Sequence, residues 1–293
     1  YANLDVGNHL ISNNLIKNTT GSGIHAWVTM QPTANVTITN NTIIGNSQYG
    51  IKIHYTMPGE SPNSIFNITN NNIVDNDRGG IYIAHGWITI NARYNKIHNN
   101  NTTDPSYNGT AITAWGNKTT IEYNTITGGD GVCSGCTTTD TALIYQSANP
   151  TYRYNNFIRD TETYLFYNTN LATNTYTLGP NWWGTTDTTN LDALIYDWND
   201  NPTKELVDYS SFLTAPNTTA PPAPPTNVAA QTGTNSIALT WAANAESDIA
   251  GYKIYYDTYQ SGYPYANSVD VGNVTTHTLS GLNTGTTYYT AVA

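Results

Sequence analysis

The stretch Val36-Thr37-Ile38-Thr39-Asn40-Asn41-Thr42-Ile43 joins an alternating apolar and polar pattern to an asparagine turn. Its last three residues form a motif, Asn-x-apolar, that recurs along the chain. Successive motifs begin 28, 30, 24, 29, 31 and 26 residues apart. A nearly constant interval of this size indicates a solenoid, in which each repeat stacks on its neighbours. The motifs are Asn13-Asn14-Leu15, Asn41-Thr42-Ile43, Asn71-Asn72-Ile73, Asn95-Lys96-Ile97, Asn124-Thr125-Ile126, Asn155-Asn156-Phe157 and Asn181-Trp182-Trp183.

The apolar positions keep register with these asparagines. Inside a repeat the period is two, as in Val36 and Ile38 or Ile51 and Ile53, which predicts strands rather than helices. Short strands at this repeat length predict an all-β fold, a right-handed parallel β-helix of about seven coils. We expect the asparagines to stack as a ladder at one corner. The residues three before each anchor are Leu10, Ile38, Ile68, Ala92, Ile121, Tyr152 and Leu178.

The composition limits the classes of partner. Only 10% of the residues are charged, and the net charge is −10 with ten Lys and Arg in total. Nucleic-acid binding requires clustered basic residues, so we predict no nucleic-acid partner. No apolar run reaches the length of about 18 residues that a membrane span needs, so no transmembrane segment is predicted. The chain opens with Tyr1-Ala2-Asn3-Leu4 rather than a signal peptide, which suggests a processed or excised chain.

The solenoid is expected to span residues 1–213 and to end in a tryptophan-rich cap at 179–213. The cap contains Gly-Pro-Asn-Trp-Trp-Gly-Thr-Thr-Asp at 179–187, then a short helix at 191–197 and a strand at 207–213. Terminal repeats of a solenoid are atypical because they cover the exposed end of the core. Residues 214–225 contain five prolines and form a predicted semi-rigid linker.

The pattern changes beyond the linker to an immunoglobulin-like sandwich at 226–293. The segment Leu282-Asn-Thr-Gly-Thr-Thr-Tyr288 resembles the Leu-x-Pro-Gly-Thr-x-Tyr corner of fibronectin type III domains, with Thr284 in place of Pro. Together with Trp241 and Tyr252, it supports that resemblance. The sequence stops at Ala293 inside the sixth expected strand, so the last strand is missing. We expect either a truncated domain or a strand supplied by another chain.

The first 213 residues resemble secreted parallel β-helix repeat proteins, which include periplasmic copper-site assembly factors and many archaeal and bacterial surface proteins. The stretch at 179–187 followed by Ile195-Tyr196-Asp197 resembles the end cap of those surface proteins. The resemblance implies the fold. Function stays open, since the same helix carries polysaccharide lyases, hydrolases, epimerases and purely structural proteins.

An outward aromatic column is the candidate binding surface. Aligning the repeats on Ile24, Ile51, Ile81, Ile112, Ile144 and Phe166 stacks the next residues as His25, Lys52, Tyr82, Thr113, Tyr145 and Tyr167. Aromatic rings stack on sugar C–H faces, which favours neutral polysaccharide as a partner. The alternative is that these aromatics only stabilise the strands as cross-strand ladders. The predicted carbohydrate-binding residues are Trp27, His54, Tyr82, Trp115, Tyr145 and Tyr167.

Catalysis would need an acid and a base. Two carboxylates serve an inverting hydrolase, and a basic residue with metal-bound carboxylates serves a lyase. The acidic and basic residues at 75–78 equally suit a tight turn. A polyanion-cleaving enzyme also needs a basic groove, yet Lys52 is the only cation in the stack. The densest candidate group is Asp75, Asp77, Arg78, His54 and His85.

Metal and cofactor sites find little support. Cys133 and Cys136 lack the second ligand pair of a structural zinc site, and Thr137 replaces the histidine of covalent haem attachment. A redox motif would need a βαβ context. We therefore predict a loop disulfide in an oxidising compartment, with a reduced pair as the alternative. Two Met and scattered His do not form a copper site. No cofactor and no metal is predicted.

The leading hypothesis is an extracellular structural protein of the cell surface that self-assembles and contacts carbohydrate. The second is a carbohydrate-active enzyme, a polysaccharide lyase or glycoside hydrolase, with an accessory fibronectin-type module. Long loops at 99–110 and 127–141 are expected to serve a ligand or a subunit contact. Glycosylation sequons support secretion only weakly. They lie at Asn18, Asn35, Asn40, Asn67, Asn100, Asn101, Asn108, Asn117, Asn217 and Asn273.

Overall fold

The computed structural model describes residues 2–3, 7–28, 34–55, 63–83, 88–100, 110–128, 142–160, 162–171, 173–259 and 262–293. The chain divides into two compact units, residues 1–221 and 222–293. The linker expected at 214–225 spans this division. Each unit is described by itself below.

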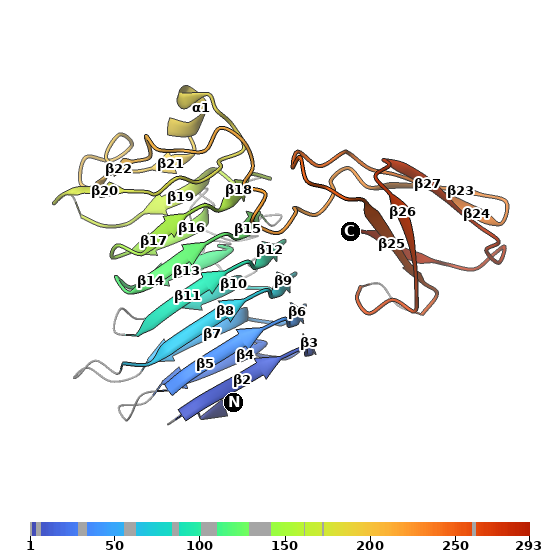
Figure 1. Cartoon of the computed structure of the whole chain (residues 1–293), viewed down its shortest axis with the longest axis horizontal. Helices are drawn as coiled ribbons and strands as arrows, with labels where there is room; N and C mark the ends of the chain where they lie inside the picture. Colours follow the sequence, from blue (N-terminus) through green and yellow to red (C-terminus); the bar gives the residue numbers. More distant parts are fainter. Residues whose placement is uncertain are drawn as a thin grey trace. The chain divides into compact units, whose positions relative to one another are not determined.

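The first unit is a parallel solenoid whose coils stack from the N-terminal end toward the cap (Figure 1). Its longest sheet, here called sheet A, takes one strand from each coil and every neighbouring pair is parallel. The strands are β1 (Ala2–Asn3), β4 (Ile24–Val28), β7 (Tyr49–Tyr55), β10 (Gly79–Ile83), β13 (Ile112–Trp115), β16 (Ala142–Ser147), β19 (Tyr164–Asn168) and β21 (Ile195–Tyr196).

Two further parallel sheets complete each coil. Sheet B contains β2 (Gly7–Ser12), β5 (Ala34–Thr39), β8 (Ile65–Thr69), β11 (Thr89–Arg93), β14 (Thr119–Glu122) and β17 (Thr151–Arg153). Sheet C contains β3 (Leu15–Lys17), β6 (Thr42–Ile44), β9 (Asn72–Val74), β12 (Lys96–His98), β15 (Thr125–Thr127) and β18 (Asn156–Ile158).

The solenoid is shorter than predicted. In the described part of the chain, sheets B and C have six strands each, and the solenoid makes about five turns rather than seven coils. The difference lies at the seventh motif. There Trp182 makes only an isolated bridge to Asn156, because the chain then turns into the cap. Asn181 still closes the asparagine ladder.

The first repeat is offset by one residue from its sequence alignment. Leu10 pairs with Thr37 and Ile11 with Ile38, so Ile11 faces the core and Leu10 is 68% exposed. The anchor of this coil is therefore Asn14 rather than Asn13. Asn13 has a left-handed backbone (φ 57°) and occupies the turn position that Asn40 holds one coil later (φ 55°). Because Asn13 and Asn14 are adjacent and identical, the sequence alignment alone could not show which of them is the anchor.

The anchor asparagines form one continuous ladder. Each side-chain amide donates to the side-chain oxygen of the next anchor at 2.9 to 3.0 Å. The next anchor's oxygen also accepts the backbone N–H of the preceding one. Asn46, Asn76 and Asn100 form a second ladder at the next corner, which the sequence analysis did not predict. The first ladder contains Asn14, Asn41, Asn71, Asn95, Asn124, Asn155 and Asn181.

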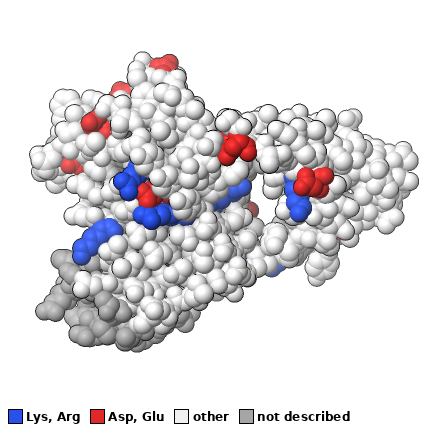
Figure 2. Space-filling model, in the orientation of Figure 1, with Lys and Arg blue, Asp and Glu red and all other residues white. Residues whose placement is uncertain are grey.

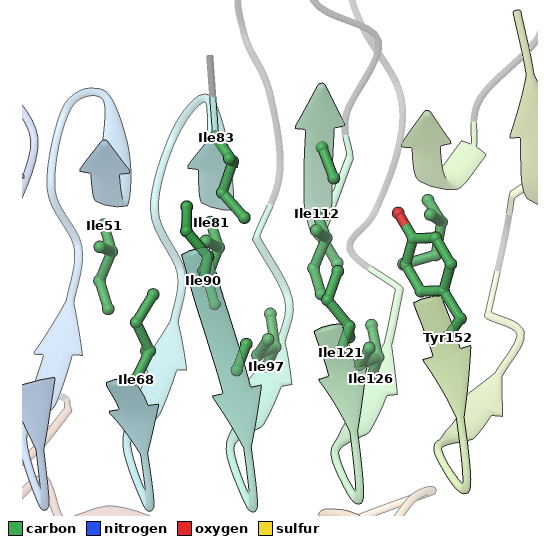
Figure 3. Packing of buried hydrophobic residues seen from close by; sticks show 14 of the residues in the cluster. Ile51, Ile68, Ile81, Ile83, Ile90, Ile97, Ile112, Ile121, Ile126 and Tyr152 are labelled. Atoms are coloured by element: carbon green, nitrogen blue, oxygen red, sulfur yellow. The ribbon is translucent and has the colours of Figure 1, made fainter. Parts of the chain in front are cut away.

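The interior is a column of isoleucines contributed by all three sheets. Ile81, Ile90 and Ile97 come from β10, β11 and β12 of one coil, and all three side chains are buried (Figure 3). Close packing also requires glycine at one corner, because a Cβ at Gly50 would overlap the Ile73 side chain. Aromatic residues replace isoleucine toward the cap, where Phe157 packs on Trp183.

The cap differs in detail from the predicted helix and strand. The helix α1 spans Thr188–Asp192, earlier than the expected 191–197, because Asp187 caps its first turn by accepting backbone N–H bonds. Residues 195–196 instead form β21 and join sheet A. The cap also pairs β20 (Thr175–Thr177) with β22 (Leu206–Asp208). Residues after the cap hold to the solenoid through Asn217, whose backbone N–H donates to Asn156 Oδ1 at 2.7 Å.

The second unit is an antiparallel sandwich. One sheet has the order β23 (Ala229–Gly233), β24 (Ser236–Thr240), β27 (Thr276–Ser280), and the other β26 (Asn267–Gly272), β25 (Tyr252–Asp257), β28 (Tyr289–Val292). Its core contains Leu239, Trp241, Tyr252, Ile254 and Leu279. Within the described residues of the whole chain, no helix has the length and hydrophobicity needed to span a bilayer.

Candidate functional site: the outer face of sheet A

The strand register of sheet A matches the alignment made from the sequence. Ile24, Ile51, Ile81, Ile112, Ile144 and Phe166 are successive partners in this sheet. The residues that follow them therefore stack on the outer face in one column, which β21 extends by one residue. That column is His25, Lys52, Tyr82, Thr113, Tyr145, Tyr167 and Tyr196.

Trp27 lies between two imidazoles at the N-terminal end of this face. Its ring is 5.0 Å from the His54 ring, edge-on, and 5.5 Å from the His25 ring. Trp27 and His54 are register partners on β4 and β7. The indole remains 38% exposed, so part of its surface is open to a ligand.

Lys52 and two tyrosines form the next group. The Lys52 ammonium lies 5.9 Å from the Tyr49 ring centre and 5.6 Å from that of Tyr82, within the range of cation–π attraction. The two rings are 4.6 Å apart. Burial lowers the pKa of Lys52, and the positive charge of Arg78 lowers it further. The sequence missed Tyr49 because strict alternation assigns it the inward direction of Ile51, yet it packs on Tyr82.

Tyr82 corrects one expectation. It was expected in a solvent-facing strip, but its side chain is only 7% exposed. It packs against the rings of Tyr49 and Trp115, the latter at 5.8 Å. Trp115 itself is 37% exposed. Among the described residues in this half of the face, the open aromatic surfaces are therefore the two indoles, and Tyr82 packs against that of Trp115.

Tyrosines also gather at the cap end of the face. Tyr167 and Tyr196 stack at 4.1 Å with nearly parallel rings, and Tyr164 packs edge-on against both. Stacked rings cover each other's faces, so this end presents ring edges and hydroxyls rather than flat platforms. Tyr145 belongs to the column by backbone register, and its side chain lies outside the described part.

The candidate catalytic residues do not form a carboxylate pair on this face. None of the described strands of sheet A contains Asp or Glu. Asp75 and Asp77 are exposed turn residues, and Asp75 has a left-handed backbone (φ 52°) like Gly45 at the equivalent turn (φ 63°). Arg78 follows them just before β10. His54 lies on the face beside Trp27, and His85 lies outside the described residues.

Other predicted sites fall partly outside the described residues. These are Cys133 and Cys136, most of the loops 99–110 and 127–141, and the sequons Asn101 and Asn108. Two further sequons donate their amide nitrogens to backbone carbonyls of the solenoid: the buried Asn100 donates to Ile73 O, and Asn217 donates to Tyr154 O. We expect no glycan on either. The remaining candidates are Asn18, Asn35, Asn40, Asn67, Asn117 and Asn273.

A second surface feature, on sheet B, escaped the sequence reading. Glu122 lies between two guanidinium groups, with Oε1 2.5 Å from Arg93 Nε and Oε2 2.6 Å from Arg153 Nε. The hydrogen bond to Glu122 raises the pKa of Arg153. The residues that directly follow Arg93, Glu122 and Arg153 are Tyr94, Tyr123 and Tyr154. Their rings stack, with centroids 5.4 Å apart in the first pair and 5.2 Å apart in the second. These residues bind neighbouring coils to each other.

The surface as a whole is polar but weakly charged, with few acidic or basic side chains on the face drawn in Figure 2. Concave pockets occur in the cap, lined by Thr175, Leu206, Tyr209 and Phe212 among others, and in the sandwich beside Asn235 and Thr284. The aromatic residues of sheet A lie instead on an extended strand surface. Such a surface suits an elongated polymer more than a small molecule.

The architecture thus defines an all-β protein with a parallel solenoid and a separate antiparallel sandwich. Comparison with family models matches a right handed beta helix region over residues 2–126 and a fibronectin type III domain over 223–293. The chain therefore contains a right-handed β-helix region followed by a fibronectin type III domain. Searches of curated proteins and of solved structures found no match.

Proposed function

We propose that this protein is an extracellular structural component of a cell surface, and that the outer face of sheet A contacts polysaccharide. Both kinds of domain are common in extracellular proteins, which supports this location. The observation that carries the proposal is the pair of exposed indoles, Trp27 and Trp115, on one face in strand register with other aromatic and hydroxyl side chains. Neutral polysaccharide is the ligand class expected for such a surface.

The test is a titration with neutral oligosaccharides. Trp115→Ala is expected to weaken binding about tenfold, because a ring that stacks on a ligand contributes on the order of 1 kcal/mol or more. Trp198→Ala is the matched control, since Trp198 is 48% exposed and lies in the cap, outside the strands of sheet A. Equal affinity of both variants and of the native protein would return these indoles to a purely structural role.

The enzyme alternative makes a different prediction. A glycoside hydrolase of the two-carboxylate type would lose turnover when either acid is replaced. Asp75→Asn and Asp77→Asn are the variants to assay, with reducing-end release as the readout. We propose binding rather than hydrolysis, because the described strands of sheet A carry aromatic, basic and hydroxyl side chains and no carboxylates.

Self-association is the second part of the proposal. Charged side chains make up 10% of the residues, so contact between two copies would desolvate few charges. Sedimentation equilibrium over a hundredfold concentration range tests this directly. A single monomer mass throughout the range would reject self-assembly and leave the carbohydrate proposal intact.

A further inference from the structure

Residues 213–221 follow the cap and lie against the solenoid, and we call them the strap. The side-chain amide of Asn156 holds both backbone groups of Asn217. Its Oδ1 accepts the Asn217 N–H at 2.7 Å, and its Nδ2 donates to the Asn217 carbonyl at 3.1 Å. One coil earlier, the hydroxyl of Thr125 donates to the carbonyl of Pro221. The strap is therefore attached to two neighbouring coils.

The strap covers the end of one outward column on sheet C. Thr125 and Asn156 are register partners on β15 and β18, and both residues are fully buried. Buried polar side chains need hydrogen-bond partners, and the strap supplies one to each of these two. The preceding members of the same column are only half-buried, and they are Thr42, Asn72 and Lys96.

Polar contacts hold the strap, and its share of the apolar core is small. Pro216 and Pro221 have no backbone N–H, so neither can donate to a strand of the solenoid. Among the strap residues, all of which the structure describes, only Ala220 is buried. A segment with few buried apolar groups opens at a lower free energy than the packed core does. Water can replace the strap at Thr125 and Asn156, since both side chains are polar.

The second unit holds the chain again directly after the strap. The buried Glu246 of the sandwich accepts the Ala223 N–H at 2.7 Å, and Asn244 Nδ2 donates to the Ala223 carbonyl at 2.8 Å. The residue between the attachment points at Pro221 and Ala223 is Pro222, which is exposed. The proline-rich connection is thus attached on both sides of Pro222.

We propose that the strap is a releasable latch. It opens as a unit from the native solenoid, and its opening converts the short connection at Pro222 into a tether of residues 214–222. In polyproline geometry this tether reaches about 28 Å, at about 3.1 Å per residue. Load applied beyond Pro222 breaks the Thr125 contact first and the Asn217 contacts next. The three sheets of the solenoid stay intact, because none of their strands lies in the strap.

Native-state hydrogen exchange of the full chain, followed by NMR, tests the latch. The Asn217 amide donates to Asn156 Oδ1 and the Ala220 amide donates to Asn217 O, so both report on the strap. The Lys96 amide donates to Asn71 O and reports on the solenoid. We expect the strap amides to be protected, yet to exchange at least about tenfold faster than the Lys96 amide. Equal rates would mean that the strap opens only with the solenoid, and unprotected strap amides would mean that it is not docked. Either result overturns the proposal.

Two variants assign the opening to named contacts. Asn156→Ala removes both bonds to the Asn217 backbone and should speed exchange of the Asn217 amide about tenfold, with the Lys96 amide unchanged. Thr125→Val keeps the side-chain shape but removes the bond to Pro221, and it should have a smaller effect in the same direction.

Asn72→Ala is the matched control. Asn72 holds the same column position on β9, where its side-chain oxygen lies 3.0 Å from His98 Nε2, and its replacement should leave exchange of the strap amides unchanged. An equal increase in Asn72→Ala and Asn156→Ala would show a general loosening of sheet C and would contradict the latch. Unchanged strap protection in both Asn156→Ala and Thr125→Val would contradict it as well.

Discussion

The side-chain oxygen of Asn71 accepts two hydrogen bonds from Asn41, one from its backbone N–H and one from its side-chain amide, each at 3.0 Å. Both residues are 1% exposed. Asn71 in turn donates through its own side chain to Asn95 Oδ1, to Ile38 O and to Thr69 O. The hydrogen-bond donors at the corner of one coil are therefore paired by the side chain of the next coil, and neither corner forms all its hydrogen bonds alone.

Replacing Asn71 by Ala should lower the free energy of unfolding by roughly 1–3 kcal/mol, the cost of leaving buried polar groups unpaired. The groups that lose partners are the Asn41 amides and the Ile38 carbonyl. Urea denaturation measures the effect. Asn35→Ala is the control, because Asn35 is exposed on β5 and should change stability by less than about 0.5 kcal/mol. Comparable losses in both variants would contradict the ladder's role.

Glu122 is expected to stabilise sheet B through its two arginines. Glu122→Gln keeps the shape but leaves the Arg93 and Arg153 guanidinium groups facing each other across one strand. The cost should be about 1–2 kcal/mol, below that of a fully buried pair, since the arginine side chains are 40% and 47% exposed. Thermal unfolding at low and high salt provides the measurement.

The comparison variant for this prediction is Arg153→Gln. It should cost less than Glu122→Gln, because the Arg93–Glu122 pair remains balanced. If Arg153→Gln proves the more damaging of the two, the central position of Glu122 in the group is wrong.

Gly128 and Glu162 should show strong energetic coupling. A Cβ added at Gly128 would overlap the carboxylate of Glu162, which is 1% exposed and cannot move into solvent freely. Gly128→Ala should therefore destabilise the native chain by about 1–3 kcal/mol. In a Glu162→Ala background the same substitution should cost little. A double-mutant cycle measures this coupling, and additive effects would exclude the contact.

The same carboxyl should make stability depend on pH. Burial raises the pKa of Glu162, and Oε1 has no hydrogen-bond partner in the described part of the chain. The folded state thus binds this proton more tightly than the unfolded state, so the group's favourable contribution is present in acid and is lost as pH rises through the folded pKa. Glu162→Gln should be more stable than the native protein at pH 7.

This advantage should shrink as the pH falls toward the ordinary range of a carboxyl group, where the native side chain is protonated in both states. Unfolding free energies measured between pH 4 and 8 test the sign. A native protein that equals or exceeds Glu162→Gln at pH 7 would show that the buried carboxylate is satisfied.

The sequence predicted those features of the structure that depend on the period of its repeats. The spacing of the Asn-x-apolar motifs and the alternation around Ile51 and Ile81 predicted the fold class and the register of sheet A. The same reasoning failed where neighbouring residues were chemically alike. Asn13 and Asn14 are interchangeable as letters, and only the left-handed turn at Asn13 assigns Asn14 to the ladder.

The sequence predicted which residues of the candidate site lie in the same column, but not which side chains contact one another. Register placed Trp27 beside His54 and Lys52 beside Tyr82, whereas side-chain packing determined which rings are exposed. Tyr49 joins Tyr82 against the simple inward and outward alternation. The Arg93–Glu122–Arg153 group depends on three residues separated by 29 and 31 positions. A ladder of identical residues appears in the sequence as a repeated residue type. A group of opposite charges in successive repeats contains no such repetition, so the sequence pattern does not reveal it.

The asparagine row has a direction, since from Asn14 to Asn155 each side-chain amide donates toward the C-terminal end. Its amide dipoles consequently point the same way and polarise one another along the solenoid axis. The row behaves as a single aligned chain of dipoles rather than as six separate bonds. An interruption near Asn95 divides that chain into two short segments, whereas an interruption at Asn14 only trims its end.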